Sequence, residues 1–238
     1  MGHRRLRGEY AWRPFCFSSR PYRPYRPYRP YRLLSYVIAP FASYQVDFVG
    51  SFPDPLVPLT PALPEVAFIG RSNVGKSSLL NSLVGRSIAR VSATPGKTTL
   101  LNAYRFPSFY MVDLPGYGFA RAGKAARAGY RALITRYLRQ RPTLAGVVWL
   151  LDIRHEPSRD DREFQQLLVG SERPVLAVLT KADKLPRGQR AAKVRALARD
   201  LELPNDPVQP TSSRTGEGMD DLAAAVLALV RSNQENGA

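Results

Sequence analysis

The sequence predicts an α/β domain in which a mostly parallel central sheet is covered by helices on both faces. Apolar runs typical of buried strands alternate along the chain with segments whose apolar residues recur at helical spacing. A glycine-rich loop joins one such strand to the helix that follows it, and further polar motifs stand after later strands. Sheets of this kind bind ligands beyond the carboxyl ends of their strands, so we expect these motifs to meet there.

The expected strands are short apolar runs. Glu65–Ile69 stands before the glycine-rich loop, and Phe109–Val112 and Pro174–Leu179 stand before later polar motifs. A short strand is also expected near Gln45–Phe52, in a proline-rich region. In order, we expect strands near 45–52, at 65–70, near 100–106, and at 109–113, 146–152, 174–180 and 207–211.

The expected helices carry their apolar residues on one side. Ser78–Val84 shows this spacing directly after the glycine-rich loop, and Leu222–Val230 is predicted to be the buried side of a helix. In order, we expect helices at 76–85, near 124–140, and at 159–169, 188–201 and 218–231. Their alternation with the strands indicates a parallel sheet with both faces covered.

The glycine-rich loop fits the phosphate-binding pattern G-x-x-x-x-G-K-[ST] at each fixed position, as Gly70-Arg71-Ser72-Asn73-Val74-Gly75-Lys76-Ser77. The backbone N–H groups of such a loop surround a phosphate, and the dipole of the following helix favours its negative charge. We expect Lys76 to reach the outer phosphates and the Ser77 hydroxyl to bind Mg²⁺. The alternative, a chance glycine turn, leaves the matching strand and helix unexplained.

A second motif, Asp113-Leu114-Pro115-Gly116, follows another expected strand. An Asp at this place can hold Mg²⁺ through water, and the Gly116 N–H can meet a terminal phosphate. The D-x-x-G pattern is common by chance, but here it follows both a strand and the phosphate loop. Between the two motifs lies Gly96-Lys97-Thr98-Thr99, where a threonine can complete the Mg²⁺ shell when a γ-phosphate is present.

A third motif, Thr180-Lys181-Ala182-Asp183, matches the [NT]-K-x-D pattern of guanine sites. The Asp carboxylate accepts two hydrogen bonds from the guanine N1–H and amino group, a donor pair that adenine lacks. The stem of Lys181 is expected to pack along the base. Thr211-Ser212-Ser213 can close the base pocket through backbone N–H groups, although this triplet alone carries little information. The alternative is a surface turn after a strand.

With these motifs in this order, the chain resembles a translation-factor-type GTPase. The segments GRSNVGKSSLLN, TPGKT, DLPGYGFA, DIRHEP, TKADKL and TSS closely resemble those of the EngB family, over roughly residues 44–231. The resemblance implies a P-loop GTPase fold and a small bacterial GTPase that helps to assemble the large ribosomal subunit. It also implies that loss of the protein disturbs cell division and septation, and it favours Thr98 over Thr99 as the Mg²⁺ ligand.

Two residues bear on the rate of the reaction. Tyr117 follows the D-x-x-G motif, where many GTPases have a Gln that orients the attacking water. Tyr cannot orient water in that way, and EngB-like proteins share the replacement, so we expect slow intrinsic hydrolysis. Asn73 resembles the Asn that supports a K⁺ ion beside the phosphates in related GTPases. The sequence leaves the use of K⁺ open.

The expected site residues combine these motifs. The expected catalytic residues are Lys76, Thr98 and Gly116, and the expected Mg²⁺ ligands are Ser77, Thr98 and, through water, Asp113. The residues expected to bind GTP or GDP are Gly70, Arg71, Ser72, Asn73, Val74, Gly75, Lys76, Ser77, Ser78, Gly96, Lys97, Thr98, Thr99, Leu100, Asp113, Leu114, Pro115, Gly116, Thr180, Lys181, Ala182, Asp183, Thr211, Ser212 and Ser213.

Three regions are expected along the chain. Residues 1–43 are predicted to be a disordered Arg/Pro/Tyr-rich extension and linker, 44–231 the GTPase domain and 232–238 a C-terminal tail. Within the extension, Arg-Pro-Tyr repeats from Arg20 to Tyr31, and proline at every third residue favours polyproline II over helix. Arg and Tyr side chains suit phosphates and unpaired bases, so the extension can be an RNA-binding tail. A low-complexity leader and a start codon assigned too far upstream are the alternatives.

Positive charge points to a polyanionic partner. The net charge is +16, and residues 1–32 alone hold nine arginines and one acid. Nucleic acid is the first candidate, here ribosomal RNA with its proteins, and an anionic membrane is the second. On the helix expected near 124–140, Lys124, Arg127 and Arg131 share a face away from the apolar stripe, which is either a partner surface or a solvated face. The segment 121–141 contains no acid and seven basic residues: Arg121, Lys124, Arg127, Arg131, Arg136, Arg139 and Arg141.

The composition argues against several other classes. Cys16 is the only cysteine, which rules out an intrachain disulfide and fits a reducing, cytoplasmic location. No apolar run approaches the length of a membrane span, and no apolar signal region follows the N-terminal arginines. We expect a monomer. Two rival functions stay open: a GTP-gated binding module without relevant hydrolysis, and a nucleotide-dependent metabolic enzyme, for which the chain leaves little room.

Overall fold

The structure, a computed structural model, describes residues 39–89, 100–118, 123–203 and 209–236. Within these ranges, seven strands form one sheet in the order β1-β3-β4-β2-β5-β6-β7. Only the pairs β1–β3 and β3–β4 are antiparallel, so the sheet is mostly parallel, as predicted. The strands are β1 (Asp47–Phe52), β2 (Glu65–Gly70), β3 (Leu101–Arg105), β4 (Tyr110–Asp113), β5 (Leu144–Asp152), β6 (Val175–Thr180) and β7 (Gln209–Pro210).

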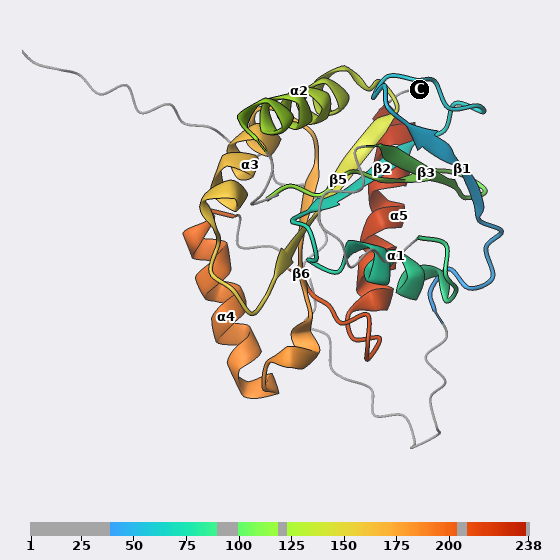
Figure 1. Ribbon diagram of the computed structural model, residues 1–238. Coiled ribbons are helices and arrows are strands. Elements are labelled where there is room, and N and C mark those ends of the chain that lie inside the picture. The colour runs from blue at the N-terminus through green and yellow to red at the C-terminus, as the bar shows by residue number, and fades with distance from the viewer. Residues whose placement is uncertain (1–38, 90–99, 119–122, 204–208, 237–238) are drawn as a thin grey trace, which may run out of the picture.

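Helices cover both faces of this sheet (Figure 1). Along β2, Ala67 and Ile69 pack into one apolar cluster, whereas Val66 and Phe68 pack into another. The first cluster includes residues of α2, α3 and α4, and the second includes residues of α1 and α5. The helices are α1 (Lys76–Val84), α2 (Lys124–Gln140), α3 (Arg159–Val169), α4 (Arg187–Asp200) and α5 (Met219–Asn236). Strands buried on both faces explain the continuous apolar runs in the sequence.

Most element boundaries lie within two residues of the prediction, and one helix end was wrong. The prediction ended the last helix at 231, but α5 continues to Asn236. The added residues contain no glycine or proline before Gly237, so nothing in their backbone chemistry stops the helix earlier. Residues 207–208 of the expected last strand and residues 1–38 of the expected extension lie outside the described ranges.

The packed part of the chain includes a residue on the N-terminal side of position 44. Phe41 is 1% exposed, and its ring makes edge contacts with the rings of Phe106 and Phe109. Its N–H donates to the Leu83 carbonyl at the end of α1, at 2.8 Å. The fold therefore begins at least three residues before the predicted start of the domain. None of the helices in the described ranges is long and apolar enough to cross a membrane.

Candidate nucleotide-binding site

The phosphate loop joins β2 to α1 and leaves a row of backbone donors unused. Gly75 is the N-cap of α1, with a φ of 106° that glycine adopts without strain. No side chain caps the helix. Among the described residues, the N–H groups of Gly75, Lys76, Ser77 and Ser78 meet no acceptor. Free N–H groups at a helix N-terminus attract an anion, and their arrangement here suits a phosphate.

Lys76 and Asp113 meet beside this loop, at the carboxyl ends of the parallel strands. β2 and β4 are parallel neighbours, with Phe68 in register with Asp113. The Lys76 ammonium forms an ion pair with the Asp113 carboxylate, and the two side chains are 12% and 6% exposed. The fold therefore brings together the first two motifs, although they are distant in sequence.

Gly116 lies directly against the phosphate loop. A Cβ atom at this position would stand 3.0 Å from both the Gly70 oxygen and the Ser72 nitrogen, so a side chain here would force this backbone to shift. Two hydrogen bonds hold the contact: Tyr117 N–H donates to Gly70 at 3.2 Å, and Ser72 N–H donates to Tyr117 at 3.0 Å. The Gly116 N–H itself has no acceptor among the described residues, so it is available to a terminal phosphate.

The third motif holds a carboxylate with one oxygen unused. Asp183 Oδ1 accepts a hydrogen bond from the Ser212 hydroxyl at 2.8 Å. Asp183 Oδ2 is buried and accepts none, and the nearest cations, on Lys184 and Arg214, stand 3.9 and 4.0 Å away. The Ser213 N–H is likewise unused within the described chain. A buried acceptor without a donor is costly, and the N1–H and amino group of guanine would satisfy it.

Two of the threonines expected at the nucleotide site use their hydroxyls within the protein. The Thr180 hydroxyl donates to the Val74 carbonyl of the phosphate loop at 2.6 Å. The Thr211 hydroxyl lies 3.3 Å from the Leu179 carbonyl, and its backbone N–H donates to that oxygen at 2.7 Å. Both side chains are buried. These bonds tie β6 to the phosphate loop and to the segment after β7, and the Ser212 hydroxyl, expected only for its backbone, orients Asp183.

Asp152 is a residue of this site that the sequence reasoning did not assign. Lys181 Nζ donates to the Asp152 carboxylate at 2.8 Å and to the Asn73 carbonyl at 2.7 Å, which ties the third motif to the phosphate loop. Burial opposes ionisation of Asp152, but hydrogen bonds from Arg154 and Lys181 outweigh it and hold the pKa of that carboxyl well below its usual range. The sequence did carry a signal for this residue, because Asp152 is an acid directly after an apolar strand, as Asp113 is.

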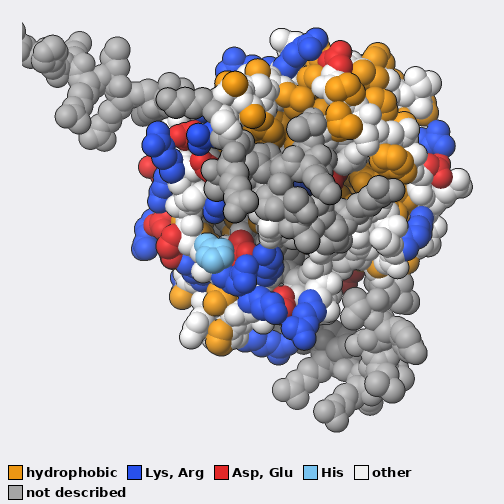
Figure 2. Space-filling model, in the orientation of Figure 1, with side chains coloured by type: hydrophobic (Ala, Val, Ile, Leu, Met, Phe, Trp, Pro, Cys, Tyr) orange, Lys and Arg blue, Asp and Glu red, His pale blue; other side chains and the backbone are white. Residues whose placement is uncertain are grey.

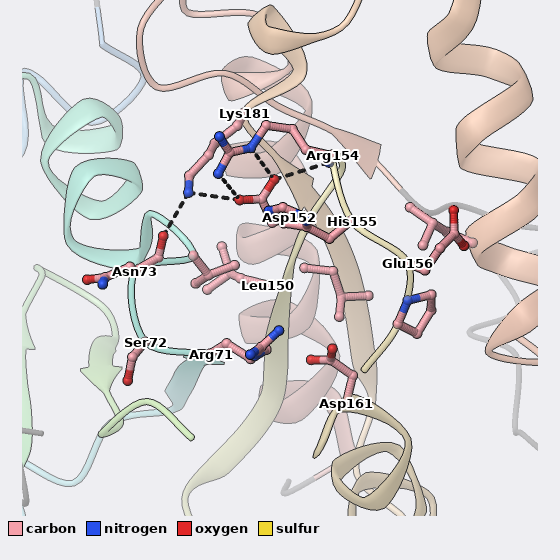
Figure 3. A pocket seen from close by; sticks show the side chains of 14 residues that line it. Arg71, Ser72, Asn73, Leu150, Asp152, Arg154, His155, Glu156, Asp161 and Lys181 are labelled. Atoms are coloured by element: carbon pink, nitrogen blue, oxygen red, sulfur yellow. Dashed lines mark hydrogen bonds and ion pairs between the residues drawn. The ribbon is translucent and has the colours of Figure 1, made fainter. Parts of the chain in front are cut away.

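A cavity of about 260 Å³ lies beside the phosphate loop, on the side of α3 (Figure 3). Arg71, Ser72 and Asn73 form one wall, and the segment after β5 with Asp161 of α3 forms another. Figure 3 shows Arg71 and Asp161 facing each other across it. The cavity contains neither Lys76 nor Asp183, so it adjoins the expected nucleotide position and is not that position.

The Tyr117 side chain points into the core. It is 5% exposed, and its ring stacks on Phe164 with centroids 4.6 Å apart. Its hydroxyl donates to Asp161 and accepts from the Trp149 indole N–H, each at 2.8 Å. Burial, followed by the nearby Asp161 carboxylate, raises the pKa of Tyr117 well above its usual value. The side chain is therefore turned away from the phosphate loop, so it cannot orient an attacking water there.

Four of the expected site residues, Gly96, Lys97, Thr98 and Thr99, lie outside the described residues. Leu100 is described and is half-buried. The expected roles of these residues, including Thr98 as a metal ligand, stay predictions.

Several basic residues of α2, and the one that follows it, are paired with acids in the fold. Arg141 is buried and paired with Glu65, with its Nε 2.8 Å from Oε1. Arg131 lies 3.5 Å from Glu163 of α3, and Arg136 lies 3.3 Å from Asp54. Counting charges along one segment misses acids supplied by other elements. Arg127 is exposed with no acidic partner among the described residues. The apolar stripe expected on this helix is confirmed, because its five residues all pack on one cluster, three of them buried and two half-buried: Ile134, Tyr137 and Leu138, then Tyr130 and Leu133.

The fold and this arrangement of motifs define a P-loop protein of the GTPase class. A family model described as "50S ribosome-binding GTPase" matches residues 65–181. The chain is 48% identical over 170 residues to a "Probable GTP-binding protein EngB" of Gemmatimonas aurantiaca, covering 71% of this chain and 83% of that protein. It is 46% identical over 186 residues to the protein of the same name from Exiguobacterium sibiricum, covering 77% and 96%.

A solved structure agrees with these relatives. The crystal structure of a probable GTP-binding protein EngB superposes with a TM-score of 0.60 at 25% identity, covering 71% of this chain and 99% of that one. The chain belongs to the EngB family of GTP-binding proteins.

Proposed function

We propose that this protein binds GTP and GDP, hydrolyses GTP slowly and acts as an assembly factor for the large ribosomal subunit. We further propose that it works as a monomer in the cytoplasm and that normal cell division and septation depend on it. The observation that carries the choice of nucleotide is the buried Asp183 Oδ2, which lacks a donor, beside the unused N–H of Ser213. Membership of the EngB family supports the same choice.

The proposed roles of the residues follow from their chemistry. The free N–H groups from Gly75 to Ser78, with the Lys76 ammonium, hold the phosphates. Ser77, Thr98 and, through water, Asp113 hold Mg²⁺, which neutralises charge on the β- and γ-phosphates when bound. The Gly116 N–H meets the γ-phosphate. A K⁺ ion beside Asn73 is an optional addition, which a comparison of hydrolysis in K⁺ and Na⁺ buffers tests.

A large-subunit partner is supported by the family model, whose description names 50S ribosome binding. It is also supported by charge, because the chain carries +16. Figure 2 shows Lys and Arg side chains gathered on the lower part of the face in view, in the region of α4 and of the segment before α5. Lys184, Arg187 and Arg214 are exposed there. Phosphate groups of RNA complement such a surface.

The inward position of Tyr117 also favours a second candidate, a GTP-gated binding module with no relevant hydrolysis of its own. Multiple-turnover phosphate release, measured with and without ribosomal particles, separates the two. Release that stays absent in both conditions supports the module, and slow release that particles accelerate supports the GTPase.

The main test uses the full chain purified free of nucleotide. Equilibrium titration should give far tighter binding of GTP and GDP than of ATP. Co-sedimentation with large and small ribosomal subunits, in GTP, GDP or no nucleotide, should give GTP-dependent association with large-subunit particles. Equal affinity for ATP and GTP contradicts the nucleotide assignment, and equal sedimentation with both subunits in all conditions contradicts the proposed partner.

A further inference from the structure

Two tyrosine hydroxyls, one half-buried and one buried, tie the D-x-x-G segment to the helices beside it. Tyr130 of α2 donates to the Pro115 carbonyl at 2.9 Å. Tyr117, at the other end of the segment, donates to Asp161 of α3 at 2.8 Å. Between these two contacts lies Gly116, whose free N–H stands against the phosphate loop. The position of Gly116 is therefore set by contacts with two helices as well as by the sheet.

The Tyr117 contact is part of a closed polar network inside an apolar core. Trp149 of β5 is fully buried, and its indole N–H donates to the Tyr117 hydroxyl at 2.8 Å. Asp161 is 4% exposed, and its second oxygen accepts from the Ser158 N–H at 2.8 Å and the Ser158 hydroxyl at 2.6 Å, as a capping box of α3. Each polar group in the network has a partner, so removal of one leaves another unpaired in a dry environment.

The same network reaches the phosphate loop through the backbone. Tyr117 exchanges two backbone hydrogen bonds with the loop, one to Gly70 and one from Ser72. Asp161 and Arg71 line the same cavity beside that loop (Figure 3). A shift of Gly116 toward or away from a terminal phosphate would have to strain or break the bond between Tyr117 and Asp161.

We propose that Tyr117 is a positioning residue for GTP hydrolysis: its hydroxyl, held by Asp161 and Trp149, fixes Gly116 against the phosphate loop. This inference rests on the proposed GTPase function. Tyr117, at the position where many GTPases have a glutamine, then positions the backbone and does not orient water. Because Trp149 donates to its hydroxyl, the fluorescence of Trp149 should report the state of this segment. Asp161 also carries the state of the segment to the first turn of α3.

The test uses Tyr117→Phe, which removes the hydroxyl and keeps the ring that stacks on Phe164. We expect single-turnover GTP hydrolysis to fall by about tenfold, the effect of an unpaired buried polar group. GDP affinity should stay near that of the unchanged protein, because the base and inner phosphates contact other residues. The matched control is Tyr110→Phe, which removes another tyrosine hydroxyl outside the site. That hydroxyl donates to the Pro61 carbonyl, at a distance of 3.0 Å. It should keep the hydrolysis rate.

Fluorescence gives a readout that a merely structural role would not move. The chain has two tryptophans, so Trp12→Phe leaves Trp149 as the only one. In that background, exchange of GDP for a non-hydrolysable GTP analogue should change the emission of Trp149, and Tyr117→Phe should abolish the change. Tyr110→Phe should keep it.

The outcomes are distinguishable. An unchanged hydrolysis rate in Tyr117→Phe, or an equal loss in Tyr110→Phe, overturns the inference. If Tyr117→Phe does not fold, Trp149→Phe carries the test, because it removes the N–H that donates to the hydroxyl and leaves a smaller aromatic ring in its place. An unchanged rate there also overturns the inference. If the unchanged protein neither binds nor hydrolyses GTP, the proposed function itself fails, and this inference fails with it.

Discussion

Asp183 has two oxygens with different surroundings, and the difference sets its chemistry. One oxygen accepts a hydrogen bond from the Ser212 hydroxyl, and this bond fixes the orientation of the carboxylate. The other is buried without a hydrogen bond and therefore favours a ligand that brings donors. A site of this kind discriminates strongly, because a ligand without those donors leaves the oxygen unpaired.

Asp183→Asn should change the preferred base from guanine to xanthine. The amide replaces an acceptor by a donor, which opposes the guanine N–H groups but suits the xanthine carbonyl. We expect GTP affinity to fall by about tenfold to a hundredfold, the effect of losing hydrogen bonds to a charged group. Affinity for xanthosine triphosphate should rise. Titration with both nucleotides measures the change, and Asp220→Asn, at an exposed carboxylate of α5, is the control. Unaltered preference would remove Asp183 from the base pocket.

Ser77→Ala should remove the effect of Mg²⁺ on GTP binding. The substitution deletes a hydroxyl that we propose binds the metal and leaves the backbone N–H in the phosphate cradle. GTP affinity measured with Mg²⁺ should then approach the affinity measured with a chelator. Ser78→Ala is the matched control, because it deletes a neighbouring hydroxyl and keeps its own N–H. If the variant keeps the full Mg²⁺ dependence, Ser77 is not a metal ligand.

At the scale of elements, α2 is joined to β2 by a buried charged network. Glu65, at the start of β2, is 1% exposed and accepts from Arg141 at 2.8 Å and from the Tyr137 hydroxyl at 2.9 Å. The Thr143 hydroxyl also contacts it. Arg141 donates in addition to the Val57 carbonyl at 2.6 Å, so the segment before β2 belongs to the same network. This network holds α2 at the end opposite the nucleotide motifs.

Arg141→Ala should destabilise the fold without changing nucleotide selectivity. Removing one partner leaves Glu65 as a buried charge without its cation, which costs about 3–5 kcal/mol. Urea unfolding should show this loss, while the ratio of GTP to ATP affinity stays constant. Arg139→Ala, two residues away at an exposed position, should lose at most about 0.5 kcal/mol. Equal stability of the two variants would mean that the buried pair contributes nothing.

The sequence predicted most of the elements because the signals at this scale are local. The glycine loop, the apolar runs and the helical spacing of Ile134, Tyr137 and Leu138 each act within a few residues. The misses involve contacts between distant segments. The sequence could not show that Glu65 neutralises Arg141, that Asp152 holds Lys181, or that Tyr117 turns toward Trp149. Its prediction of where α5 ends was also wrong, because the polar residues there neither favour nor stop a helix strongly.

At the scale of the whole molecule, positive charge is spread over several surfaces and over the N-terminal residues. Residues 1–32 carry nine arginines and one acid and include none of the site residues expected from the sequence. Deleting them should leave GTP affinity and thermal stability almost unchanged, as measured by titration and thermal unfolding. A large loss of either would mean that this region packs on the domain.

The same deletion should weaken binding to any RNA at low salt, because it removes cations that contact phosphates.

The last prediction concerns which surface meets the ribosomal partner, and it is best tested in the chain lacking residues 1–32. Replacing Lys124, Arg127 and Arg131 by Ala should lower binding to large-subunit particles and flatten its dependence on salt, because each phosphate contact releases counterions. Of the two arginines, Arg127 should contribute more to the loss, since Arg131 lies beside Glu163. GTP affinity should stay near that of the parent, because none of the three is assigned to the nucleotide.

The comparison variant replaces three exposed arginines of α4, the other basic region that RNA could meet, by Ala: Arg187, Arg195 and Arg199. It removes the same net charge from another helix. A larger loss for the α2 variant assigns the partner to α2, which follows the Gly116 segment and is bonded to it through Tyr130. An equal loss for both variants shows that only overall charge matters. A larger loss for the α4 variant moves the partner surface to α4, beside the base pocket rather than beside the γ-phosphate.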